Sequence, residues 1–403
     1  MKLRLLLVLA CAVVALANHN LNAQTLDRKA NELHGVWVST VSNIDYPSKP
    51  GLTSEQLAAE ADAWLDLAQQ MRFNAVFLQV RPMCDAMYRS SIFPWSHFLT
   101  GEQGKAPDNN FDPLEYWIRE AHKRNIQVHA WLNPYRVAVS AKTLEKLADD
   151  NPAKIHPEWT FEHKGKTYLD PGIPEARQLV VSGVIEIVEN YDVDGIHIDD
   201  YFYPERKVDA DKATYEKFGQ DFDNIEDWRR HNVDLFIEEA AKAIRERKPQ
   251  VVWSVSPAGV WANKGSNPLG SDTRGNQCYY DLFADVRGWV KKEWIDAVIP
   301  QIYWEFGFKP ADFQILVDWW SDVVADTNVR LYIGTAAYRV DPNAKSEAWR
   351  DPEQLTRQLE YMASKPEVSG QVFFTAHNFK KGQPAREPVE KFGEKNKWSA
   401  NER

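Results

Sequence analysis

The 403-residue chain has no excess of positive charge. Its 48 Lys and Arg residues stand against 58 Asp and Glu residues, which gives a formal net charge of -10. Proteins that bind nucleic acids or anionic membranes need basic patches, so this balance argues against both kinds of partner. Cysteine is also scarce, with three residues, and that excludes a disulfide-dense miniprotein.

Several motifs that signal particular chemistries are missing. The sequence contains no HxH, HExxH or CxxC pattern, so we expect no dedicated metal site and no metal among its cofactors. It has no GxSxG turn for a serine nucleophile. No Gly-rich phosphate loop follows any expected strand, which argues against an open doubly wound sheet. We expect no cofactor.

Aromatic residues, in contrast, are abundant. They make up 12% of the chain and include 16 Trp. Each indole N–H requires a hydrogen-bond partner when it is buried, so this number favours rings displayed at a surface or cleft. The hydrophobic and charged fractions, 44% and 26%, are those of an ordinary globular protein.

The N-terminus has the pattern of an export signal. Lys2 and Arg4 precede an apolar run over residues 5–17 that is too short to span a bilayer. We therefore expect a signal peptide over residues 1–23, with cleavage after Ala23 or already after Ala17, and an exported protein in the periplasm or envelope. No later apolar run reaches the length of a transmembrane helix, so we expect none in the mature chain.

The three cysteines leave two questions open. Cys11 ends a stretch similar to a lipoprotein cleavage box, so a lipid tether at Cys11 is the alternative to simple secretion. Cys84 and Cys278 remain after processing, and either one disulfide or two buried thiols fits their number.

The remainder alternates strand and helix. Eight apolar, β-branched runs are separated by amphipathic segments, and eight such strands predict an α/β fold of the (β/α)8 TIM-barrel type. An open doubly wound sheet is the alternative. We expect the barrel over residues 24–380 and a charged C-terminal tail over 381–403. The expected strands are 35–41, 74–80, 126–132, 193–199, 251–256, 296–303, 329–335 and 369–375, and the expected helices are 53–71, 112–124, 174–190, 227–247, 280–292, 311–325 and 352–364.

In such a barrel the active site lies where the strands end. The long insertions, 81–111, 136–173, 200–226 and 257–279, all follow expected strand ends, and loops of this kind build a cleft over a rigid barrel.

Side-chain alternation selects the acids. In strand 193–199 it places His197 and Asp199 on the inward face, and in the sixth strand it places Tyr303 and Glu305 there. Two facing carboxylates are the apparatus of glycosidic bond hydrolysis. We expect Asp199 as nucleophile or general base, Glu305 as general acid, and Asp200 as a polarising neighbour that can exchange roles with Asp199. The alternative is that Asp199 and Asp200 cap the next element or pair with Arg81 or Arg136, and that Glu305 is a solvated loop residue.

Other residues at the strand ends suit a sugar. Pyranose rings stack on aromatic faces, while their hydroxyl groups bind amides and arginine. For any single ring, packing in the core is the alternative. The candidate substrate-binding residues are Trp37, Arg81, Asn133, Tyr135, Arg136, His197, Tyr201, Tyr203, Tyr303 and Trp304.

Five stretches carry a family resemblance: His34-Gly35-Val36-Trp37-Val38, Phe73 to Pro82, Asn133-Pro134-Tyr135-Arg136, Asp194 to Pro204 and Pro300 to Trp304. Together they resemble the bacterial glycosyl hydrolase-like 10 family. The resemblance covers about residues 30–380, and its most specific element is the Asp-Gly-x-His-x-Asp-Asp-Tyr-Phe-Tyr-Pro run.

The resemblance implies a TIM-barrel glycoside hydrolase acting outside the cytoplasm, with a polysaccharide such as peptidoglycan glycan strands as substrate. Two other classes remain: a non-catalytic glycan-binding envelope protein, and a metal-dependent sugar deacetylase.

Overall fold

The structure, a computed structural model, describes residues 32–398. The expected signal peptide and Cys11 lie outside the described residues. Over residues 32–398, none of the helices combines the length and the apolar character that a bilayer crossing requires.

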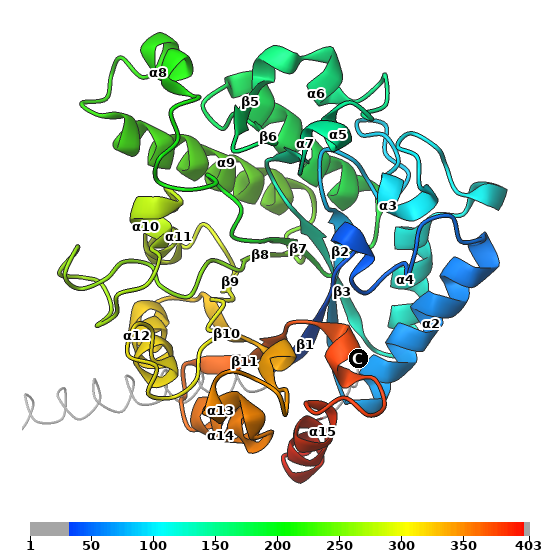
Figure 1. Ribbon diagram of the computed structural model, residues 1–403, viewed down its shortest axis with the longest axis vertical. Helices are drawn as coiled ribbons and strands as arrows, with labels where there is room; N and C mark the ends of the chain where they lie inside the picture. Colours follow the sequence, from blue (N-terminus) through cyan, green and yellow to red (C-terminus); the bar gives the residue numbers. More distant parts are fainter. Residues whose placement is uncertain (1–31, 399–403) are drawn as a thin grey trace, which may run out of the picture.

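Eight parallel strands close into a barrel, as predicted (Figure 1). Going round the barrel the order is β1, β2, β3, β7, β8, β9, β10 and β11, and β11 pairs with β1. Each predicted strand overlaps one of these. Their bounds are β1 (Leu33–Val38), β2 (Ala75–Arg81), β3 (Gln127–Leu132), β7 (Gly195–Ile198), β8 (Val252–Val255), β9 (Ala297–Val298), β10 (Arg330–Thr335) and β11 (Val368–Phe373).

The long helices surround the strands (Figure 1). Two of these helices begin at strong capping residues: Thr53 and Gln56 form a capping box on α2, and Asp112 caps α4 ahead of Pro113. The bounds are α2 (Ser54–Gln70), α4 (Pro113–His122), α7 (Pro174–Asn190), α9 (Ile225–Arg247), α12 (Phe313–Val324) and α14 (Glu353–Ala363), with short helices α3 (His97–Thr100), α5 (Ala141–Leu144), α6 (Pro152–Ile155), α8 (Lys212–Phe218) and α13 (Glu347–Arg350).

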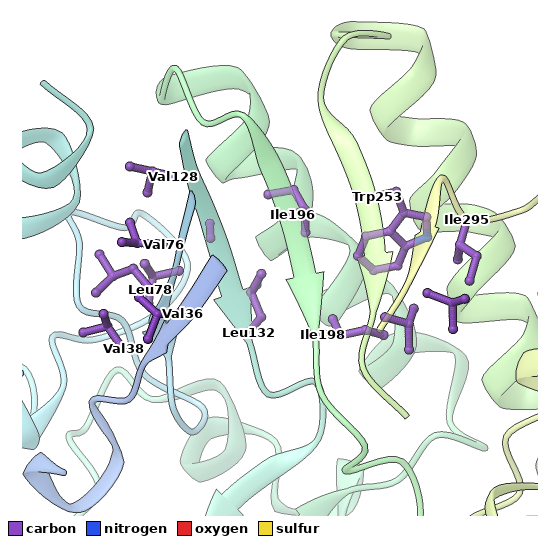
Figure 2. Packing of buried hydrophobic residues seen from close by; sticks show 14 of the residues in the cluster. Val36, Val38, Val76, Leu78, Val128, Leu132, Ile196, Ile198, Trp253 and Ile295 are labelled. Carbon is purple, nitrogen blue, oxygen red and sulfur yellow. The ribbon is translucent and has the colours of Figure 1, made fainter. Parts of the chain in front are cut away.

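The hydrophobic core has two layers. The outer layer fills the space between strands and helices with residues such as Val76, Ile196 and Ile198 (Figure 2). The inner layer fills the barrel and contains Phe77, whose ring stacks on His129 with a centroid distance of 4.5 Å. This histidine ring leaves no room at Gly195, where an added Cβ would lie 2.2 Å from His129 Nδ1. Side chains therefore pack closely inside the barrel at the level of Gly195.

The insertion after β3 forms a small antiparallel sheet that we did not predict. Its strands are β4 (Arg136–Ala138), β5 (Thr160–His163) and β6 (Lys166–Leu169), in the order β4-β6-β5. We call residues 136–169 the insertion lobe. Its strands are three or four residues long, too short for a recognisable alternation of polar and apolar residues.

Two helix expectations need correction. The helix expected over 280–292 is two short ones, α10 (Cys278–Asp281) and α11 (Val286–Lys291), because Phe283 between them has a positive φ of 54°. The stretch expected as a charged tail contains α15 (Arg386–Lys395), whose Val389 and Phe392 are buried. Charge dominates its composition, but its apolar residues lie on one face and dock there.

Candidate active site

A cleft of about 410 Å³ opens at the C-terminal ends of the barrel strands, where barrel enzymes place their active sites. Seventeen described residues from the strand ends, the segment after β1 and the insertion lobe line it: Trp37, Ser39, Val41, Ile44, Gln79, Trp131, Arg136, Val139, Lys166, Tyr168, Asp199, Asp200, Tyr201, Ser256, Gln301, Tyr303 and Phe374.

Asp199 lies at the floor of this cleft, directly after β7. Trp131 Nε1 donates a hydrogen bond to its Oδ2 over 3.0 Å, and Asn133 Nδ2 lies 3.2 Å from both carboxylate oxygens. The side chain is 3% exposed. Burial raises its pKa to about 7 and nearby Asp200 adds to the increase, against the opposing effects of Arg136 and of the two hydrogen bonds.

Asp200 is the second acid in the cleft and is half-buried. Gln301 Nε2 donates to its Oδ1 over 3.2 Å and also to the Ser256 carbonyl oxygen over 2.9 Å, so the amide is fixed from two sides. Burial raises the pKa of Asp200 as well, although Gln301 and Arg136 favour the ionised form. The two consecutive acids therefore turn toward different neighbours, Asp199 toward β3 and Asp200 toward the segment after β9.

A buried histidine holds one ring of the floor in place. Trp37 Nε1 donates to His197 Nε2 over 3.2 Å, and His197 Nδ1 lies 2.9 Å from Ser254 Oγ. Burial lowers the pKa of His197 well below its usual value, so the ring is neutral and can accept from the indole. His197 points inward as predicted, but it lies beneath the cleft and positions Trp37 instead of lining the cleft.

The insertion lobe supplies the positive side of the cleft. Arg136 lies over the ring of Tyr201 at 4.2 Å from its centroid, and Lys166 and Tyr168 of β6 line the same wall. Among residues 32–398, neither cation has an ion-pair partner. The cleft therefore combines two acids on its floor with two cations on its wall.

Arg81 is not in the cleft. The pairing of β2 with β3 shifts register between Gln79 and Arg81, so that Arg81 lies opposite Leu132, whose side chain belongs to the outer layer. The guanidinium is fully buried there, 4.6 Å from the centroid of the Phe93 ring, and donates to the carbonyl oxygens of residues 133 and 134. An irregularity of one residue has reversed the expected face.

Three predicted sugar-stacking rings also lie elsewhere. Tyr135 is completely buried and contacts Phe236, and Tyr203 is buried against Phe283. Trp304 packs on the outer core, and its carbonyl oxygen accepts a bond from a side chain of α14. For these rings the alternative of core packing holds. Asn133 does not line the cleft either, but its amide contacts Asp199 from below.

Glu305 is not brought together with Asp199. Ser346 Oγ and Trp349 Nε1 each donate to its carboxylate over 2.7 Å, which ties it to α13. Its pKa is lowered: burial alone would raise it, but these bonds and Arg339 outweigh that effect. The alternation that places Gln301 and Tyr303 in the cleft does not reach Glu305, because the last bridge of the sixth strand is at Gln301 and no neighbouring strand fixes the chain at Glu305.

The candidate list omitted several residues that line the cleft. Gln79 and Phe374 could have been found from strand alternation. Each comes two residues after a residue of the inner layer, Phe77 or Val372, at the C-terminal end of β2 or β11. Lys166 and Tyr168 carried no such signal, since their place depends on the fold of the insertion lobe. In the part of the chain that the structure describes, no group of three or more His, Cys, Asp and Glu could hold a metal ion. Cys84 and Cys278 are both free and buried.

The sequence is similar to those of known proteins. The model of the family described as Glycosyl hydrolase-like 10 matches residues 32–351. Glycosyl hydrolase YngK of Bacillus subtilis is 44% identical over 365 residues, which is 89% of this chain and 70% of that protein. Glycosyl hydrolase DigH of Escherichia coli K12 is 39% identical over 380 residues, covering 89% of this chain and 86% of that protein.

A solved structure shares the fold. The PgaB (BpsB) glycoside hydrolase domain from Bordetella bronchiseptica superposes with a TM-score of 0.56 at 14% identity, over 89% of this chain and 99% of that one. At this identity the likeness concerns the barrel and its connections alone.

Proposed function

Because the chain belongs to the glycosyl hydrolase-like 10 family, we propose that it hydrolyses glycosidic bonds of a polysaccharide outside the cytoplasm, and that its substrate is the glycan strand of peptidoglycan. The signal-like N-terminus supports the location. A lipid tether at Cys11 remains the alternative to simple secretion.

The observation that carries this proposal is the pair of carboxyl groups on the cleft floor. Asp199 and Asp200 both have raised pKa values, and two neighbouring acids in a buried site retain one proton between them near neutral pH. The protonated member can deliver its proton to the leaving glycosidic oxygen. The ionised member can stabilise the positive charge that develops at the anomeric carbon.

The walls of the cleft support a glycan with acidic substituents. Tyr201 and Tyr303 provide faces on which pyranose rings can stack. Arg136 and Lys166 are cations without a carboxylate partner among the described residues. The lactyl group of muramic acid ends in a free carboxylate whenever no stem peptide is attached, and this carboxylate could pair with the two cations. We therefore propose that strands without stem peptides bind better than strands that carry them.

The test is product release from purified peptidoglycan with and without stem peptides. Soluble oligosaccharides, identified by mass spectrometry, are expected from both and faster from the stripped strands. Absence of products from peptidoglycan and from a panel of neutral and acidic polysaccharides would refute the hydrolase proposal. If strands were then bound without cleavage, and Asp199→Asn bound them equally, the non-catalytic glycan-binding class would be favoured.

A further inference from the structure

The two acids of the cleft come from one place in the barrel. They are consecutive residues after β7, and they are the two carboxylates among the described residues that line the cleft. The other strand ends around the mouth contribute residues without a carboxylate, among them Trp37, Gln301, Tyr303 and Phe374. Hydrolysis by two carboxylates requires one on each side of the anomeric carbon, about 5–5.5 Å apart for retention and about 6.5–9.5 Å apart for inversion. Within the described residues, the facing partner is therefore missing.

Glu305 does not fill that position. Both of its oxygens accept hydrogen bonds from residues at α13, Ser346 and the buried Trp349. Releasing it would leave the Trp349 indole N–H buried without a partner, so the carboxylate is held where it is. The described part of the cleft thus has an acid to protonate the leaving group and no protein nucleophile opposite it.

We propose that the missing nucleophile belongs to the substrate: the carbonyl oxygen of the 2-acetamido group on the sugar whose bond is cleaved. This inference rests on the proposed function and narrows its substrate class to glycans of N-acetylated amino sugars. It assigns Asp200 as general acid and base, and Asp199 as the carboxylate that orients the acetamido group.

Hydrogen bonding supports this division of roles. Both oxygens of Asp199 face N–H donors, from Trp131 and Asn133, which is the environment of an acceptor. The Tyr201 backbone N–H also donates to Oδ1 over 3.3 Å. A substrate amide N–H would be a further donor and would hold Asp199 ionised. The single proton of the pair then resides on Asp200, of which Gln301 engages only Oδ1, leaving Oδ2 for the leaving oxygen.

The aromatic lining of the cleft suits the rest of the acetamido group. Trp131 donates to the carboxylate, and Trp37 and Phe374 line the same cleft. The rings of Trp37 and Phe374 lie edge-on with centroids 6.0 Å apart. Such an apolar bed accommodates a methyl group better than a sugar hydroxyl, which would lose its hydrogen bonds there. Tyr303 lies in the same lining, and burial together with the charge of Asp200 keeps its pKa well above the usual value. Its neutral phenol can donate to the acetamido carbonyl oxygen.

The first step forms a bond between this carbonyl oxygen and the anomeric carbon while the bond from that carbon to the glycosidic oxygen breaks. The leaving oxygen takes the Asp200 proton, and Asp199 balances the positive charge on the cyclised oxazolinium ring. In the second step water attacks the anomeric carbon and gives its proton to Asp200. The bond from the anomeric carbon to the acetamido oxygen breaks in the same step, which restores the acetamido group. Two displacements at one carbon retain its configuration.

The experiment uses one batch of peptidoglycan strands without stem peptides. The strands are N-deacetylated, and portions are then re-acylated with acetyl or with trifluoroacetyl groups. Fluorine withdraws electrons from the carbonyl oxygen, so we expect the trifluoroacetylated strands to react at least about 100-fold more slowly than the re-acetylated control. The free amine strands should not be cleaved. The thiazoline derived from chitobiose, which mimics the cyclised intermediate, should inhibit competitively.

Variants connect the result to the residues. Asp199→Asn should lower kcat on re-acetylated strands by about 100-fold or more. Asp234→Asn is the matched control, because Asp234 also accepts from a buried indole and has a pKa raised to about 6, but lies on α9 outside the cleft. It should keep the wild-type rate.

Equal cleavage of acetylated and trifluoroacetylated strands, or a first product with inverted configuration by proton NMR, would overturn substrate assistance and leave the hydrolase function standing. Absence of cleavage of all strands and all other polysaccharides would overturn both.

Discussion

Replacing Asp199 by Asn is expected to stabilise the protein while it removes activity. The pKa of this carboxyl rises from 3.8 to about 7 on folding, chiefly because it is buried. A difference of about three units corresponds to a destabilisation of about 4 kcal/mol at any pH above 7, where the native state must hold a charge that the unfolded state solvates freely. An amide carries no such charge.

The substitution also replaces a hydrogen-bond acceptor by a donor. Trp131 can still donate to the one oxygen that the new side chain keeps. The new NH2 group, however, faces two other donors, Asn133 Nδ2 and the Tyr201 backbone N–H. Asn133 cannot simply turn round, because its Oδ1 accepts from the Arg136 backbone N–H over 2.9 Å. An unsatisfied buried donor costs about 1–3 kcal/mol, so we expect a net gain of about 1–3 kcal/mol for Asp199→Asn at pH 8.

The sign of the pH dependence follows from the raised pKa. Between about pH 4 and pH 7 the native state binds more protons at this site than the unfolded state, so the wild type loses stability as pH rises through that window. The variant does not lose stability in this way, because its amide does not titrate. Its advantage should be largest at pH 8 and absent or reversed at pH 4, where only the misplaced donor remains.

Thermal unfolding of both proteins at pH 4, 6 and 8 measures this difference. For a chain of this length we expect the midpoint of the variant to lie roughly 1–4 °C above wild type at pH 8. Glu305→Gln is the control that should show the opposite pH dependence. The pKa of Glu305 is lowered, so its ionised carboxylate stabilises the folded protein at neutral pH, and this stabilisation is lost as pH falls. A shift for Asp199→Asn that does not change with pH, or a lower midpoint at pH 8, would refute the burial argument.

Three further predictions concern catalysis. The value of kcat/KM should fall as pH rises above about 7, because the Asp199–Asp200 pair then loses its shared proton; a pH–rate profile that stays flat to pH 9 would contradict this. Lys166→Gln should raise KM for strands with free lactyl groups about two- to fivefold and weaken the salt dependence of KM, with no change on neutral chito-oligosaccharides, as steady-state kinetics can establish. Glu305→Gln should keep kcat within about threefold of wild type while it lowers the melting midpoint at neutral pH, since its bonds hold α13; a loss of activity at unchanged stability would restore Glu305 as a catalytic acid.

The fold was accessible from the sequence because its determinants are local. Runs such as those of β2 and β10 are apolar on both faces, as parallel strands inside a barrel must be. Helix starts at Thr53 and Pro113 carried their own caps. The elements that were missed lack such signals, namely the short strands of the insertion lobe and the break at Phe283.

The sequence predicts the site residues correctly only where strand pairing fixes the alternation of side chains. The inward direction of Asp199 follows from its position after β7, and Gln301 and Tyr303 line the cleft as their parity indicates. Arg81 was misplaced because a register shift in β2 has no sequence signature, and Glu305 because parity was extended beyond the last paired residue. Lys166 reaches the cleft through tertiary structure alone.

The central claim is that Asp199 and Asp200 together form the catalytic pair. The most direct test compares the initial rate of oligosaccharide release from stripped peptidoglycan strands by wild type, Asp199→Asn, Asp200→Asn, Glu305→Gln and Asp234→Asn, each confirmed as folded by circular dichroism. We predict a fall of about 100-fold or more for the first two variants and near wild-type rates for the other two. Undiminished release by either Asp199→Asn or Asp200→Asn would contradict the account.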